Sequence, residues 1–423
     1  MFVNKSRNPG ASEILSQLFL NKELRSRVLT TLGLLLLVRL GIYIPMPGID
    51  RVAFKSFIDQ GGQLIGFLDI FTGGGISTLG IFALGILPFI NASIIIQLLT
   101  SAVPHLEHLK KEGGEQGRKQ INQYTRYGTV LLAAMQGFGI AVGLERAEGI
   151  VINPGVFFEI SAVITLVGGT VFLMWLGEQI TARGVGNGIS LIIFAGIVAE
   201  LPGALVSTLE LGRQGALSTL VILMLLVMVA VVIAFIVFME RAQRRLIVQY
   251  PKRQVGNKMT GGENSHLPLK LNVAGVIPPI FASSLLLLPI TVANFSGTGG
   301  SELLGNVTAL LGQGQPLYMA FYAGGIIFFC FFYTSIVFNP SDTADNLKRS
   351  GGFIPGIRPG ERTAEYLDKV LTRLTVVGAL YLTLVCLLPE VLINQYSVPF
   401  YLGGTSLLIV VSVTMDTVSQ VQS

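Results

Sequence analysis

Long apolar stretches separated by polar loops dominate the pattern of this chain. A helix needs about 20 apolar residues to cross the hydrocarbon core of a bilayer, and ten stretches meet or approach that length. Strands of a membrane barrel would instead alternate over about ten residues. The pattern therefore predicts an all-α polytopic membrane protein with about ten transmembrane helices, at residues 28–44, 79–103, 128–144, 156–176, 189–206, 217–239, 273–292, 317–338, 370–388 and 398–415.

The composition is that of a chain whose surface largely faces lipid. Hydrophobic residues make up 51% of the 423 residues and charged residues only 13%, whereas soluble chains are about a quarter charged. Cys330 and Cys386 lie in apolar runs, and His105, His108 and His266 lie in polar loops. We therefore expect neither a disulfide nor a metal site. Residues 1–27 lack the apolar core of a cleaved signal peptide, so we expect none.

Lysine and arginine residues are concentrated in alternate loops, and this sets the expected orientation. Most of the 29 basic residues precede the first span or lie in the polar loops at 105–127, 240–270 and 339–369. Basic loops stay on the cytoplasmic side of a membrane. We therefore expect these loops to be cytoplasmic, together with both termini, because an even number of spans returns the chain to its starting side. The loops at 45–75 and 293–315 then face outward.

The outer loop at 45–75 contains a short apolar segment, LIGFLDIF at 64–71, which is followed by Thr72 and three glycines. About eight residues are too few to cross a bilayer. The segment can be a re-entrant helix, which a bilayer tolerates only against protein or a water-filled cavity. It can equally be a small helix at the membrane interface, and the spacing alone leaves both interpretations open.

The predicted spans contain few ionisable residues, and those present, Glu159, Glu200 and Arg373, lie near span ends. An ion-coupled transporter keeps carboxylates or histidines at the midplane to carry the coupling charge. A passive conduit with an apolar constriction needs none, because such a constriction blocks ions by dewetting. The sequence also lacks GxxxxGK[ST], HExxH and GxSxG motifs. We therefore expect a conduit that is not an enzyme, has no cofactor and takes any ATP energy from a partner.

Several long strings carry a family resemblance through most of the chain. They are IPMPGID at 44–50, IFALGILPFINASIIIQLLT at 81–100, QYTRYGT at 123–129, FLMWLGEQITARGVGNGIS at 172–190, HLPLKLNVAGVIPPIFASS at 266–284, FNPSDTADNLKRSGGFIPGIRPGERT at 338–363 and VPFYLGGTSLLIVV at 398–411. In sequence, order and spacing they resemble the SecY family, the channel subunits of the bacterial Sec protein translocase.

The resemblance implies a central protein-conducting channel that passes unfolded secretory polypeptides across the membrane and releases transmembrane segments sideways into lipid, driven by SecA or the ribosome. It implies two pseudo-symmetric five-helix halves, 1–207 and 208–423, around an hourglass pore. The implied location is the bacterial plasma membrane, and also the thylakoid membrane if the host is photosynthetic. The implied partners are SecE, SecG, the SecA ATPase, the ribosome through its RNA and proteins, signal peptides and nascent chains, YidC, SecDF and anionic lipids.

The family's ring of aliphatic pore residues maps onto six isoleucines of this sequence. Two of them pair at i, i+4 spacing within each of two predicted helices, so each pair shares a helix face. Isoleucine is stiff at χ1, which suits a gasket around a peptide. The alternative is that an isoleucine in a membrane helix simply faces lipid or a neighbouring helix. The ring residues are Ile86, Ile90, Ile189, Ile193, Ile280 and Ile409.

Three further groups of residues correspond to functional parts of the family. The plug that rests outside the ring corresponds to Leu64, Ile65, Phe67, Leu68, Asp69, Ile70 and Phe71 within 64–75. The lateral gate corresponds to Asn91, Gln97, Asn187, Asn272 and Leu288, although each polar member can also make an ordinary interhelical hydrogen bond. The docking surface for SecA and the ribosome corresponds to Arg244, Arg245, Lys252, Arg253 and Arg358.

Alternatives remain for the basic loops and for the protein as a whole. The loops can fix topology and contact anionic lipid, and they can also neutralise ribosomal RNA phosphates. The chain can be an ion-coupled small-solute transporter, which would move protons or sodium with its substrate. It can also be a membrane scaffold that docks ribosomes without transporting anything.

Overall fold

The computed structural model describes residues 10–60, 74–146, 149–216, 218–260, 262, 264–295, 302–311, 315–396 and 404–422. Each predicted span overlaps a helix. In chain order these helices are α2 Lys22–Ile42, α6 Leu87–Ala102, α8 Gly114–Arg146, α9 Val156–Arg183, α10 Gly188–Arg213, α11 Thr219–Arg241, α12 Ile277–Phe295, α14 Pro316–Val337, α16 Glu361–Tyr396 and α17 Gly404–Gln422.

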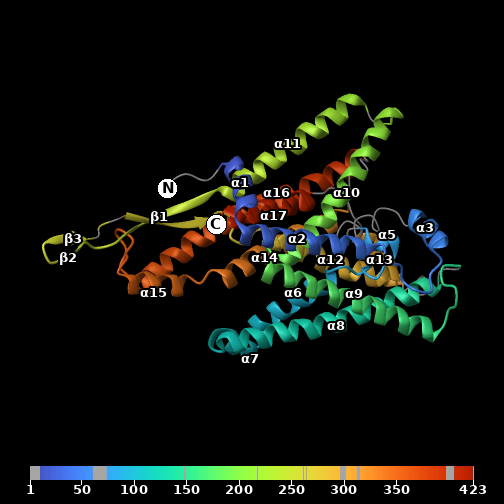
Figure 1. The fold of residues 1–423 in the computed structure, drawn as a ribbon, viewed down its shortest axis with the longest axis horizontal. Coiled ribbons are helices and arrows are strands. Elements are labelled where there is room, and N and C mark those ends of the chain that lie inside the picture. The colour runs from blue at the N-terminus through green and yellow to red at the C-terminus, as the bar shows by residue number, and fades with distance from the viewer. Residues whose placement is uncertain are drawn as a thin grey trace.

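The long helices form an elongated bundle with shorter elements at its two ends (Figure 1). One end carries a β-hairpin and the helices α1 Ala11–Leu20, α7 Pro104–Glu112 and α15 Pro340–Ser350. The other carries α3 Arg51–Gln60, α5 Gly75–Thr78 and α13 Glu302–Leu310. Within the described residues, six helices are long and apolar enough to cross a membrane, and a seventh span arises if α6 and α7, bent by 95°, count as one.

The second span is shorter than its apolar run predicts. The run begins at residue 79, but α6 begins at Leu87, with Pro88 in its first turn. The residues before it pair with another backbone segment instead, since Ile81 N donates to Ile44 O (3.1 Å) and Met46 N donates to Leu79 O (3.1 Å). The prediction of a helix from residue 79 was therefore wrong, because backbone pairing between distant residues competes with the local pattern.

The polar loop at 240–270 folds as a hairpin rather than as irregular chain. Strands β1 Gln243–Gln249 and β4 Asn264–Lys270 pair antiparallel, and β2 Arg253–Val255 pairs with β3 Lys258–Thr260 beyond them. Two turn residues, Gly256 and Asn257, separate β2 from β3, a spacing typical of tight hairpins. Side chains in the middle of β1 alternate, with Leu246 and Val248 buried and Arg245 and Ile247 exposed. The described spans are thus all helical, with two small two-stranded sheets outside them.

Three apolar clusters form the interior. The largest draws residues from α2, α6, α9, α10, α11, α12, α14, α16 and α17. A second lies among α3, α8 and α9, and a third lies between the hairpin, the 351–360 loop and α16. The N-terminal and C-terminal helices meet where α6 contacts α12 and where α10 contacts α17. Since α10 continues to Arg213, the half boundary after residue 207 falls inside this helix.

Candidate functional site: an apolar cluster beside a polar cavity

All six proposed ring isoleucines lie in or against one apolar cluster. Five of them, Ile86, Ile90, Ile193, Ile280 and Ile409, are at most 6% exposed, and Ile189 packs against the same cluster. They come from the start of α6 and from α10, α12 and α17. The structure therefore gathers residues from distant parts of the sequence, from both sides of the α6–α12 and α10–α17 contacts.

The segment carrying Ile86 is held by a close backbone approach. A Cβ atom added to Gly169 of α9 would lie only 2.0 Å from Ile81 O, so glycine is needed for α9 and this segment to touch. The Phe82 ring packs beside it and stacks on Phe172 of α9 with centroids 6.1 Å apart. These contacts fix where the chain turns into α6, and with it the position of Ile86, the residue immediately before this helix.

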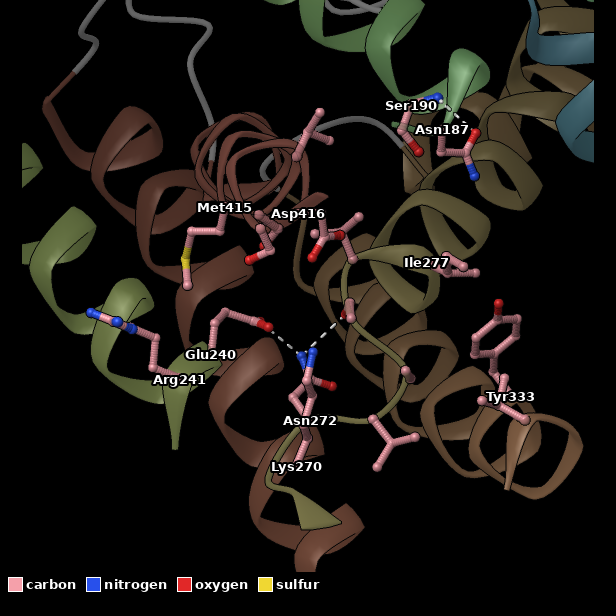
Figure 2. Close-up of a pocket in the computed structure, with 18 of the residues that line it drawn as sticks. Asn187, Ser190, Glu240, Arg241, Lys270, Asn272, Ile277, Tyr333, Met415 and Asp416 are labelled. Carbon is pink, nitrogen blue, oxygen red and sulfur yellow. Dashed lines mark hydrogen bonds between the residues drawn. The ribbon is translucent and has the colours of Figure 1, made fainter. Parts of the chain in front are cut away.

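A polar cavity of about 520 Å³ adjoins the isoleucine cluster (Figure 2). Its walls come from the beginnings of α10 and α12 and the ends of α11, α14 and α17. Figure 2 shows Asn187 and Ser190 of α10 on one side, and Glu240 of α11 and Asp416 of α17 on the other. Ile277, about one turn before Ile280, also lines it. Val276 and Val413 both line the cavity and belong to the apolar cluster, so the two adjoin.

Asn272 forms hydrogen bonds inside the C-terminal half. Its Nδ2 donates to Glu240 Oε1 (2.9 Å) and to Gly275 O (3.1 Å), as Figure 2 shows. The same Glu240 oxygen accepts from the Tyr381 hydroxyl of α16 (3.2 Å). These bonds tie the chain entering α12 to α11 and α16. The sequence pattern missed Glu240 and Tyr381; a carboxylate at the end of a strongly apolar run was the only available signal.

The other proposed gate residues have different surroundings. Asn91 of α6 is buried, and its Oδ1 has no hydrogen-bond partner among the described residues; the same holds for the buried Oε1 of Gln97. Asn187 caps its own helix, since its Oδ1 accepts from Ile189 N (3.1 Å) and Ser190 N (3.5 Å). The Leu288 side chain lies outside the described residues. So do the proposed plug residues Leu64, Ile65, Phe67, Leu68, Asp69, Ile70 and Phe71.

The proposed docking residues lie on two loops that the fold joins. The backbones of Gln249 in β1 and Phe353 exchange two hydrogen bonds (2.9 and 3.0 Å). Leu246, Ile354 and Leu367 pack in the third apolar cluster beneath them. Four of the proposed docking residues are exposed: Arg244 and Arg245 on β1, Lys252 just before β2, and Arg358 on the second loop. The Arg253 side chain lies outside the described residues.

Comparison with known proteins identifies the family. The SecY family model matches residues 80–418. Over 406 residues the chain is 57% identical to the protein translocase subunit SecY of Escherichia coli (strain K12), which covers 95% of this chain and 91% of that relative. The chain belongs to the SecY family. The SecY subunit of Vibrio cholerae serotype O1 is 53% identical over 424 residues, covering 99% and 95% of the two chains.

Solved structures of SecY-type channels share the fold. A structure described as that of a protein conducting channel superimposes with a TM-score of 0.68 at 18% identity, covering 94% of this chain and 92% of that one. Sec61 in the canine ribosome-channel complex from the endoplasmic reticulum gives 0.64 at 17% identity, with the same coverage. The predicted family and all-α polytopic fold are thus confirmed. Family membership makes the chain a multi-pass membrane protein that works as a protein-conducting channel.

Proposed function

We propose that Ile86, Ile90, Ile189, Ile193, Ile280 and Ile409 form the constriction of this channel. The observation that carries the proposal is their convergence, from four regions of the chain, in one buried cluster beside a polar cavity. Packed together they exclude water, and an apolar neck blocks ions by dewetting. A translocating polypeptide separates the helices that carry them, and the stiff branched side chains close around it.

The N-terminal helices through α10 and the C-terminal helices from α11 onward move apart at the contact between α6 and α12. This contact is the lateral gate through which a hydrophobic segment passes into lipid. Because Asn272 is bonded to Glu240 and through it to Tyr381, α12 moves with its own half. The plug, assigned to residues 64–75, seals the outer side of the constriction at rest.

The joined basic loops are the docking surface for the partners that drive transport. Arg244, Arg245, Lys252, Arg253 and Arg358 meet acidic or phosphate groups of the SecA ATPase or of the ribosome. SecE and SecG are the accompanying membrane subunits. The protein lies in the bacterial plasma membrane with both termini in the cytoplasm, because the basic loops remain on that side. It catalyses no bond chemistry itself, and its partners supply the energy.

Combined replacement of Ile86, Ile193 and Ile409 by alanine tests the constriction. The complex with its partner subunits is reconstituted into liposomes, and ion leak and preprotein import are measured. We expect ion leak to rise severalfold and preproteins with weakened signal peptides to be accepted. The reason is that the smaller alanine side chains leave a wider opening in the closed constriction. A matched triple variant replaces Ile95, Ile164 and Ile233, which are 40%, 67% and 36% exposed, and should retain normal leak. Unchanged ion leak in the Ile86, Ile193 and Ile409 variant would refute the proposal that these isoleucines form the constriction.

A further inference from the structure

Three buried hydroxyl groups connect helices of the C-terminal half. Ser283 Oγ of α12 donates to the Tyr322 hydroxyl of α14 (3.3 Å), and this hydroxyl is also hydrogen-bonded to Thr405 Oγ1 of α17. The three residues are 0%, 1% and 6% exposed. The Cys386 thiol of α16 lies in hydrogen-bonding range of Thr405 and Tyr322. We call Ser283, Tyr322 and Thr405 the hydroxyl bridge.

The bridge lies one helical turn from each ring residue of this half. Ser283 follows Ile280 by three positions in α12, and Thr405 precedes Ile409 by four in α17. Residues three or four apart are neighbours on a helix surface. The separation of α12 from α17 at the level of the ring therefore depends on the Tyr322 hydroxyl, which bonds to both helices.

Hydrogen bonds are better suited than apolar contacts to fixing the distance between α12 and α17. Helices in a membrane gain little from hydrophobic attraction, because lipid chains are as apolar as their side chains. Apolar surfaces can also slide past one another, whereas a hydrogen bond between hydroxyl groups needs a defined distance and direction. A buried hydroxyl that loses its partner is costly since no water replaces it. The bridge therefore favours one spacing of the two helices over others.

We propose that Tyr322 is a positioning residue of the constriction. Its hydroxyl holds α12 and α17 at the spacing at which Ile280 and Ile409 close against the isoleucines of the N-terminal half. The inference rests on the proposed ring function. The Tyr322 hydroxyl sets the distance between the two helices that carry the C-terminal ring residues. Loss of this hydroxyl therefore widens the closed constriction while the C-terminal half remains folded.

Tyr318 provides a matched control one turn earlier on α14. Its ring stacks on that of Tyr322 with centroids 6.0 Å apart and an interplanar angle of 11°. It is equally buried, at 1% exposure. Its hydroxyl, however, has no hydrogen-bond partner among the described residues. Tyr318→Phe and Tyr322→Phe therefore remove the same atom from similar surroundings, and only the second removes the bridge.

The test measures ion leak and import of a preprotein with a weakened signal peptide, using the reconstituted complex. For Tyr322→Phe we expect leak to rise about fivefold, the shift that loss of one hydrogen bond gives in a closed–open equilibrium, and the weakened preprotein to be accepted. Thr405→Val should act in the same direction, and Thr405→Ser, which keeps the hydroxyl, should restore normal leak. Tyr318→Phe should leave leak unchanged. Thermal unfolding in detergent confirms that each variant is folded.

The outcomes separate this inference from the proposed function. If the triple alanine variant of the ring leaks and Tyr322→Phe does not, the proposed spacer role of Tyr322 is wrong, while the proposed constriction stands. Equal leak from Tyr318→Phe and Tyr322→Phe would also overturn it, because the effect would then come from any lost buried hydroxyl. If the ring variants themselves do not leak, both proposals fail together.

Discussion

Gly169 of α9 lies where the backbone of the segment before α6 crosses that helix. The distance of 2.0 Å between an added Cβ and Ile81 O is far below any normal contact, and the obstructing atom is backbone rather than a flexible side chain. Its neighbour Gly168 has open space, with nothing within 4 Å of an added Cβ. Two adjacent glycines therefore have unequal roles, and only Gly169 affects the position of Ile86.

Gly169→Ala should destabilise the protein and Gly168→Ala should not. The first forces α9 away from the segment at 81–86, and overpacking of this kind typically costs about 1–3 kcal/mol. The second adds a methyl group in open space, where alanine favours a helix more than glycine does. Thermal unfolding of the purified complex in detergent measures both. A Gly169→Ala variant as stable as the parent would show that the crossing can relax freely.

At the scale of elements, the hairpin and the 351–360 loop form one body outside the spans. Backbone bonds between Gln249 and Phe353 join them, and a small apolar cluster lies beneath. Thr363 Oγ1 donates to Arg358 O (2.8 Å) and holds the backbone that carries this arginine. The Arg358 side chain remains exposed, so its charge can change without disturbing the loop.

Arg358→Glu should impair import driven by SecA while leaving the protein folded. The charge reversal places a carboxylate within the proposed docking surface. Arg349→Glu makes the same charge change at another exposed position, in the last turn of α15. ATP-dependent import into reconstituted vesicles compares the two. Equal loss in both variants would mean that total charge, rather than the position of Arg358, governs docking.

At the scale of the whole molecule, basic residues are distributed unevenly along the chain, and this predicts its orientation in the membrane. The hairpin and the proposed docking loops lie at one end of the bundle, and α3 and α5 lie at the other (Figure 1). Two exposed apolar residues mark these ends, Val255 in the hairpin at 70% and Ile152 between α8 and α9 at 65%. Cys330 and Cys386 are buried at 1%, so they should contribute little background in thiol labelling.

Val255→Cys and Ile152→Cys should react with a membrane-impermeant maleimide from opposite sides. We expect Ile152→Cys to be labelled in intact spheroplasts and Val255→Cys only after the membrane is opened. The reason is that basic loops remain in the cytoplasm, and Val255 lies between Lys252 and Lys258. The parent protein serves as the unlabelled control. Labelling of Val255→Cys in intact spheroplasts would contradict the proposed orientation.

The sequence by itself determined the class of this protein and most of its span positions. Long apolar runs need no tertiary information, because the bilayer thickness alone sets their length. The family strings pointed to the six proposed ring isoleucines, which the structure brings into or against one cluster. The hairpin was only partly within reach of the sequence. Gly256-Asn257 is typical of a turn, but Leu246, Ile247 and Val248 form a continuous apolar run, and only the structure shows that Ile247 is exposed between two buried neighbours.

Only the tertiary structure decided which polar groups meet. Asn272 was expected to bond either across the lateral gate or to a neighbouring helix of the bundle, and its described bonds are of the second kind, to Glu240 of α11 and to the nearby Gly275 O. The bridge of Ser283, Tyr322 and Thr405 joins residues from three helices that no spacing in the chain connects. Helix periodicity fixes neighbours within one helix. Hydrogen-bond partners on other helices depend on how the helices pack together, and the local sequence around each residue does not determine this packing.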